Sequence, residues 1–250
     1  MDLYEAIMKR KSVRHFQNRA IPKDVLIDIL EYARNIEPLD NSIKINIELV
    51  ECSKKIFSAP YYMVLYSDEK AGYCENAGYV MQYLVMYLTS MGLGSCYQGY
   101  TGAVAKRDAV GRKRVISVAF GYADEDELRD PLQASRLTQK EICLFKEEPN
   151  ANIYKLIEAV RMSPSSLNSQ PWRLVVYKDK MHIFVTKARW GAGKKLNEIN
   201  TGVALANIDM AADSQWIDII KKKIPAMKDR GNGKLEYVIS LKNVLDIIMQ

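Results

Sequence analysis

Paired cysteines and long apolar runs are both absent from this sequence. Its four cysteines form no CxxC pair and show no metal-ligand spacing, so we expect no metal site; they are Cys52, Cys74, Cys96 and Cys143. No signal peptide is recognisable, and we therefore expect reduced thiols in the cytoplasm. Gln82 interrupts the longest apolar run, which leaves nothing near the roughly 20 residues of a membrane span.

Long basic runs are missing as well, although the net charge is +6. The basic residues are scattered, with small clusters at 112–114 and 221–223. This pattern favours solvated faces and argues against nucleic acid as a partner. With 48% hydrophobic and 26% charged residues, the 250-residue chain has ordinary globular composition.

Hydrophobic periodicity predicts alternating helices and strands, which indicates an α+β fold. The expected helices are a short one containing Leu3 to Met8 and longer ones at 22–36, 71–91 and 153–162. The expected strands lie at 43–50, 61–66, 115–122, 174–177 and 235–241. The helix at 71–91 is apolar around most of its circumference and should be central.

A glycine-rich segment, Gly92-Leu93-Gly94-Ser95-Cys96-Tyr97-Gln98-Gly99, follows that central helix. It is not a dinucleotide fingerprint, because it follows a helix and lacks a third glycine at the required place. Its glycines still permit close backbone approach to a ligand. Cys96 has no histidine nearby in sequence, so we interpret it as a small buried residue and not a nucleophile.

A polar loop at 163–173 contains the sequence Ser-Pro-Ser-Ser-Leu-Asn-Ser-Gln-Pro-Trp-Arg. Gln170 precedes a proline, which favours an extended backbone entering the next strand. The carboxamide of Asn168 offers a donor and an acceptor, which suits the pyrimidine edge of a flavin. The alternative is an ordinary Ser/Asn/Pro loop.

A short basic segment near the N-terminus, Arg10-Lys11-Ser12-Val13-Arg14, places three cations and a hydroxyl within five residues. Such a set could bind a phosphate dianion, with the forked arginine donors matching its oxygens. The alternative is a surface run. Arg136, beyond an acidic turn, could be a late phosphate ligand. His15 has no nearby partner that would make it a base, and His182 lies in a strand pattern, so we interpret it as structural.

The chain also shows weak internal similarity. Residues 30–34 resemble 157–161, at an offset of 161 − 34 = 127, and 76–78 resemble 200–202, at an offset of 202 − 78 = 124. This predicts two copies of one helix-strand-strand-helix-strand unit, in halves 1–146 and 147–250. The alternative is that any two α+β halves look alike at this level.

Together these motifs resemble the nitroreductase family of flavin mononucleotide (FMN) enzymes. Residues 10–14 resemble its phosphate and ribityl motif, 163–172 its Ser-Pro-Ser-Ser-x-Asn-x-Gln-Pro-Trp motif, and 92–99 its Gly-Leu-Gly-Ser segment. Arg136 sits where the family often places a late phosphate-binding residue. The resemblance implies a nitroreductase-like α/β/α sandwich with a mainly antiparallel sheet.

The order of the motifs departs from that family. Its members usually carry the Pro-Ser-Ser-x-Asn motif early, where this chain has residues 35–40 without a match. Usual members are homodimers in which the neighbouring subunit supplies this motif. The departure implies two homologous halves fused as an intramolecular pseudo-dimer with one flavin per chain, either a monomer or a homodimer of such chains.

The resemblance implies an FMN-dependent oxidoreductase that takes electrons from NAD(P)H and passes them to a small-molecule acceptor. The alternative is a flavin-binding protein without turnover, in sensing or storage. No side chain is needed as a catalyst, because the chemistry resides on the flavin. The implied cofactor-binding residues are Arg10, Lys11, Ser12, Arg14, Gln98, Gly99, Arg136, Pro164, Ser165, Ser166, Asn168 and Gln170.

Overall fold

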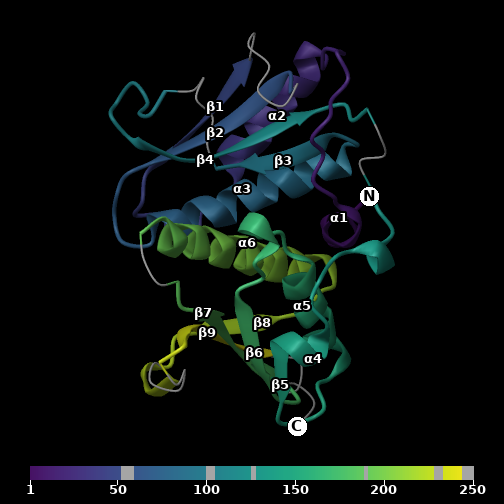
Figure 1. Ribbon diagram of the computed structural model, residues 1–250, viewed down its shortest axis with the longest axis vertical. Helices are drawn as coiled ribbons and strands as arrows, with labels where there is room; N and C mark the ends of the chain where they lie inside the picture. Colours follow the sequence, from purple (N-terminus) through teal and green to yellow (C-terminus); the bar gives the residue numbers. More distant parts are fainter. Residues whose placement is uncertain (52–58, 100–104, 125–127, 189–190, 228–232, 244–250) are drawn as a thin grey trace. The chain divides into compact units, whose positions relative to one another are not determined.

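The computed structural model (Figure 1) describes residues 1–51, 59–99, 105–124, 128–188, 191–227 and 233–243. The chain divides into two compact units, Met1–Ala134 and Ser135–Gln250. The division therefore falls before the boundary expected after Lys146. The reason is that strand β5 (Cys143–Phe145) pairs in parallel with β6 (Trp172–Val176) and so joins the second unit.

In its described residues, the first unit combines three helices with a four-stranded antiparallel sheet. The helices are α1 (Leu3–Lys9), α2 (Lys23–Asn35) and α3 (Tyr73–Ser90). The strands are β1 (Ile45–Glu51), β2 (Tyr61–Ser67), β3 (Gly94–Gln98) and β4 (Lys113–Gly121), in the order β1-β2-β4-β3, and a 3-10 turn follows at Pro131–Gln133. Helix α3 packs against α2 and three of the strands, and it has buried residues on all of its sides, which confirms that it is central.

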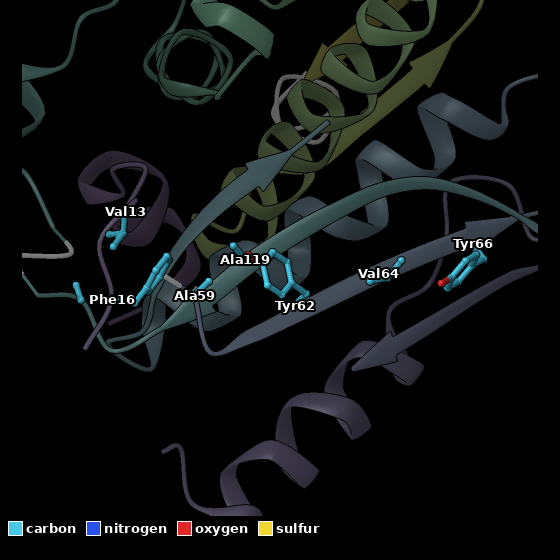
Figure 2. Close-up of a cluster of buried hydrophobic side chains, with 8 residues drawn as sticks. Val13, Phe16, Ala59, Tyr62, Val64, Tyr66 and Ala119 are labelled. Carbon is cyan, nitrogen blue, oxygen red and sulfur yellow. The ribbon is translucent and has the colours of Figure 1, made fainter. Parts of the chain in front are cut away.

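The core of this unit also fixes the chain that follows α1. All seven residues of β2 are buried, and every second residue of a strand faces the same side of the sheet. Tyr62, Val64 and Tyr66 share one buried cluster with Val13 and Phe16 (Figure 2). Because burying one such side chain contributes about 1.5–3 kcal/mol, these two residues anchor the N-terminal segment on the sheet.

The second unit has helices on a five-stranded sheet. Its helices are α4 (Gln139–Ile142), α5 (Ala151–Met162) and α6 (Ala192–Ser214), with a 3-10 turn at Ser166–Asn168. Its strands are β5, β6, β7 (Lys180–Thr186), β8 (Ile219–Lys222) and β9 (Leu235–Asn243), in the order β5-β6-β7-β9-β8. Apart from β5, these strands pair antiparallel, so both units confirm the expected α+β class with mainly antiparallel sheets.

The two units share one topology. The order β6-β7-β9-β8 repeats β1-β2-β4-β3, with α5 and α6 in the places of α2 and α3. The register slips in equivalent strand pairs, between Leu65 and Tyr66 where β2 meets β4, and between Ile183 and Phe184 where β7 meets β9. The two units therefore share an order of helices and strands, while the repeat in the sequence stays a prediction.

The two long helices also end alike. After α3, Leu93 N donates to Leu88 O at 2.9 Å, and Gly92 has a φ of +75°. After α6, Ile217 N donates to Ala212 O at 2.8 Å, but the left-handed residue is Trp216, with a φ of +55°. Glycine is the usual residue at this position because a Cβ is strained there. The Trp216 side chain is 89% exposed, so little packing offsets that strain.

Replacing Trp216 with glycine should therefore raise stability. Glycine adopts the left-handed conformation without strain, which should raise the free energy of unfolding by about 1 kcal/mol. The greater conformational freedom of glycine in the unfolded chain makes this gain somewhat smaller. The midpoint of urea unfolding of the full chain measures this change. Trp216→Ala serves as the control, since it removes the indole and keeps the strain, and it should show no comparable gain. A lower midpoint for Trp216→Gly would contradict the prediction.

Among the described residues, no helix combines the length and apolar character needed to cross a membrane.

Candidate functional site

The basic segment 10–14 lies against the glycine-rich segment in the first unit. Ser12 and Ser95 form a parallel bridge, and Val13 N donates to Ser95 O at 2.9 Å. A Cβ built on Gly94 would lie 2.8 Å from Val13 Cγ2, so this close approach requires glycine. The structure thus brings together two of the segments that the sequence predicted to bind a ligand. It also shows Gly94–Gln98 as strand β3, which the glycine-rich sequence did not predict.

Arg10 is the buried centre of this region. It is 4% exposed, and its Nη1 donates to Ser12 Oγ at 3.5 Å. The backbone of Arg10 forms an antiparallel β-bridge with Leu128, and Arg129 N donates to Lys9 O at 2.8 Å. These contacts place Arg129 beside Arg10. Burial, and then the charge of Arg129, lower the pKa of Arg10 to about 10.

No carboxylate pairs with Arg10 among the residues that the structure describes. Arg14 is exposed and adds a further positive charge that acts on Arg10, while Lys11 and Ser12 are half-buried. A buried cation among other cations is costly without a counter-ion. These side chains therefore fit a bound anion such as a phosphate, and Arg129 is a member of the set that sequence reasoning missed.

The end of β3 offers further groups beside this set. Gln98 is 8% exposed, Gly99 is exposed, and a Cβ on Gly99 would meet no atom of the described residues within 4 Å. The hydroxyl of Ser95 is buried and has no hydrogen-bond partner within the described residues. Burial raises the pKa of the Cys96 thiol, although Arg14 and Arg10 act in the opposite direction. Cys96 is thus the buried small residue that we expected.

The loop 163–173 lies in the second unit and has a strained backbone. Leu167, Asn168 and Gln170 have φ values of +53°, +53° and +44°. Each such non-glycine residue costs about 1–3 kcal/mol and persists only where its surroundings hold it. Inside the loop, Gln170 N donates to Ser165 Oγ at 2.9 Å. Pro164, Ser165 and Ser166 are half-buried, so the loop is partly open to solvent.

The residues just before α4 hold this loop. Arg136 Nη1 donates to Asn168 Oδ1 at 3.0 Å, and Asn168 Nδ2 donates to Ser135 O at 3.1 Å. Leu137 N donates to Gln170 Oε1 at 2.8 Å. Asn168 is exposed and keeps one free N–H and one lone pair, so its carboxamide still has a donor and an acceptor for a ligand.

Arg136 therefore has contacts that the sequence did not indicate. Its Nη2 also donates to Met162 O at 3.3 Å, and the side chain belongs to the second unit with Asn168, whereas Arg10 and Arg14 belong to the first. The structure thus groups the twelve predicted residues into two sets, one in each unit. His182 lies in β7 with Nδ1 2.6 Å from Ser240 Oγ, which fits a structural role.

Known proteins similar to this chain include two that are described as putative nitroreductases. A protein of Staphylococcus haemolyticus (strain JCSC1435), described as a putative NAD(P)H nitroreductase, is 32% identical over 108 residues, which are 39% of this chain and 50% of that protein. The match thus spans half the length of this relative. A Thermotoga maritima protein described as a putative nitroreductase has a crystal structure with a TM-score of 0.68, at 19% identity, over 97% of this chain and 94% of that one.

The structural similarity confirms the expected nitroreductase-like fold. A family model described as "Putative TM nitroreductase" matches residues 2–212, which include both sets of site residues. The chain therefore belongs to this nitroreductase family, as its motifs indicated.

Proposed function

We propose that the chain is an FMN-dependent oxidoreductase that passes electrons from NAD(P)H to a small-molecule acceptor. The observation that carries this proposal is the buried Arg10, which lies beside Arg129 and has no carboxylate partner among the described residues. The chain's membership of a nitroreductase family supports an oxidoreductase, and the name of the Staphylococcus relative supports NAD(P)H as the reductant. When bound, FMN would supply the redox chemistry, while the protein would hold and orient it.

The residues of the first unit would bind the phosphate end of the flavin. Arg10, Arg14 and Arg129 would neutralise its charge through forked hydrogen bonds, with Lys11 and Ser12 beside them. The backbone amides around Gln98 and Gly99 would support the ring, because the space beside Gly99 is open among the described residues. The unpartnered hydroxyl of Ser95 fits a polar ligand as well.

The residues of the second unit would recognise the ring edge and the ribityl chain. Asn168 would use its remaining donor and acceptor, with Ser165 and Ser166 beside it and Pro164 shaping the turn. Arg136 and Gln170 would act by holding the loop in place, since Arg136 donates to Asn168 and Gln170 accepts from Leu137 N. We further propose one flavin per chain, because the second half lacks a counterpart of the 10–14 segment.

Mixing the flavin-loaded protein with NADH or NADPH in an anaerobic stopped-flow instrument tests this function. The visible absorbance of the oxidised flavin should disappear at least as fast as the enzyme turns over. An added nitroaromatic acceptor should restore this absorbance. A yellow protein that does not bleach with either nucleotide would instead support the flavin-binding alternative. Chromatography of the released cofactor should show the mononucleotide, because no dinucleotide fingerprint is present.

A further inference from the structure

A buried asparagine in the central helix of the second unit holds the strained loop. Asn200 lies in α6 and is 3% exposed. Its Oδ1 accepts hydrogen bonds from Ser166 N at 3.0 Å and Ser166 Oγ at 3.3 Å. Ser166 immediately precedes Leu167 and Asn168, which have positive φ values, so this contact fixes the loop at the start of its strained part.

The first unit contains the equivalent contact. Asn76 lies in α3, the topological counterpart of α6. Its Oδ1 accepts from Asp40 N at 2.9 Å, and its Nδ2 donates to Asp40 O at 3.4 Å. Both asparagines thus tie the loop after the preceding helix to the central helix, although only the second loop carries the Ser-Asn-Gln motif.

The two contacts differ in one respect. Asn76 uses both ends of its carboxamide on one backbone residue, whereas Asn200 Nδ2 is buried without a partner among the described residues. A buried amide without a partner costs about 1–3 kcal/mol, and a purely structural contact would be expected to avoid this cost. Asn200 thus accepts two hydrogen bonds from Ser166 through Oδ1, while its buried Nδ2 donates none to the described residues.

We propose that Asn200 is a positioning residue of the flavin site, which holds Ser166 so that Asn168 keeps its ligand-binding conformation. This inference rests on the proposed function. Asn200 acts through the loop, and its effect on a ligand should therefore depend on the presence of the Asn168 carboxamide. Asn76 provides a matched comparison, because it makes the same kind of contact to a loop without that motif.

Titration of the flavin-free protein with FMN, followed by flavin fluorescence, tests this role. Asn200→Ala should weaken FMN binding about tenfold, the loss of roughly one hydrogen bond to a positioned loop. Asn200→Asp should bind FMN within about threefold of the unsubstituted protein, because a carboxylate oxygen accepts the same two hydrogen bonds. Asn76→Ala should lower the thermal midpoint of the flavin-free protein as Asn200→Ala does, yet change FMN affinity by less than about twofold, since its loop lacks the motif.

A double-mutant cycle separates positioning from general destabilisation. In the Asn168→Ala background, Asn200→Ala should have little further effect on FMN affinity, because coupled residues are not additive. Full additivity, or equal weakening by Asn76→Ala and Asn200→Ala, would overturn the positioning role. Should Asn200→Ala fail to fold, Asn200→Leu replaces it, since leucine fills a similar volume without hydrogen bonds. Failure of the unsubstituted protein to bind FMN would refute the proposed function itself.

Discussion

Replacing Arg10 with methionine should weaken FMN binding by about ten- to hundredfold, because one charge-assisted contact is worth about 1.5–3 kcal/mol. The flavin-free protein should be at least as stable as before. Methionine retains the apolar stem that packs in the interior, while the buried charge disappears. Isothermal titration with FMN and thermal unfolding of the flavin-free protein measure the two effects separately.

The sign of the stability change follows from the charges around Arg10. Burial and Arg129 lower its pKa to about 10, so the folded protein binds this proton less tightly than the unfolded chain does. Below that pH the side chain is charged in both states, and the full cost of burying the charge is present at neutral pH. Substitution removes the cost of burying the charge, and a bound phosphate would offset that cost.

Arg34 provides the control for this experiment. It is an exposed arginine in the last turn of α2, and Arg34→Met should leave FMN affinity unchanged. Unchanged affinity in Arg10→Met as well would mean that residues 10–14 are a surface run after all. A large loss of stability in the flavin-free Arg10→Met protein would contradict the assignment of Arg10 as a buried cation that lacks a counter-ion until a ligand binds.

Asn168→Ala should weaken FMN binding by about 1–3 kcal/mol, because a polar edge of the ligand loses its partner. Asn168 is exposed, and part of its carboxamide is already held by Ser135 and Arg136, so the remaining donor and acceptor are preorganised. Ser169→Ala is the control, since Ser169 is exposed in the same loop and lies outside the proposed binding set. Equal effects of the two substitutions would count against a specific role for Asn168.

Mixing the two defective proteins tests whether one chain supplies all the binding residues. Arg10→Met and Asn168→Ala proteins should not rescue each other, and the unsubstituted protein should saturate near one FMN per chain. In a homodimer that shares its sites, subunit exchange would restore one intact site per mixed pair. Rescue after demonstrated exchange, or a stoichiometry of two, would contradict the proposed single-chain site.

Elements with strong periodicity were predictable from the sequence, and non-local pairing was not. The α3 helix and the buried β2 strand lie where their apolar patterns placed them. Strand β3 was missed because Gly94-Ser95-Cys96 lacks an apolar-polar alternation, and it is a strand through its pairing with β4. The parallel β5–β6 pair joins segments far apart in sequence, so no local pattern could predict it.

The same distinction applies to the candidate site. The compact segments 10–14 and 163–172 were visible as motifs because their residues are adjacent in sequence. Arg129 was not found, since it comes near Arg10 through backbone contacts far apart in sequence, namely the bridge between Arg10 and Leu128 and the hydrogen bond from Arg129 N to Lys9 O. Asn200 was noticed only as part of a repeat, because its contact with Ser166 spans 34 positions.

The shared topology of the two units has a consequence for how the protein can change. In a symmetric homodimer every codon change alters two equivalent positions at once, so a loop cannot lose its ligand-binding groups on one side alone. Here the equivalent positions are encoded separately. Topologically equivalent places already hold different residues, with Gly92 and Trp216 at the helix ends and Asp40 and Ser166 in contact with the two asparagines. Each unit can thus acquire substitutions that its counterpart would not tolerate.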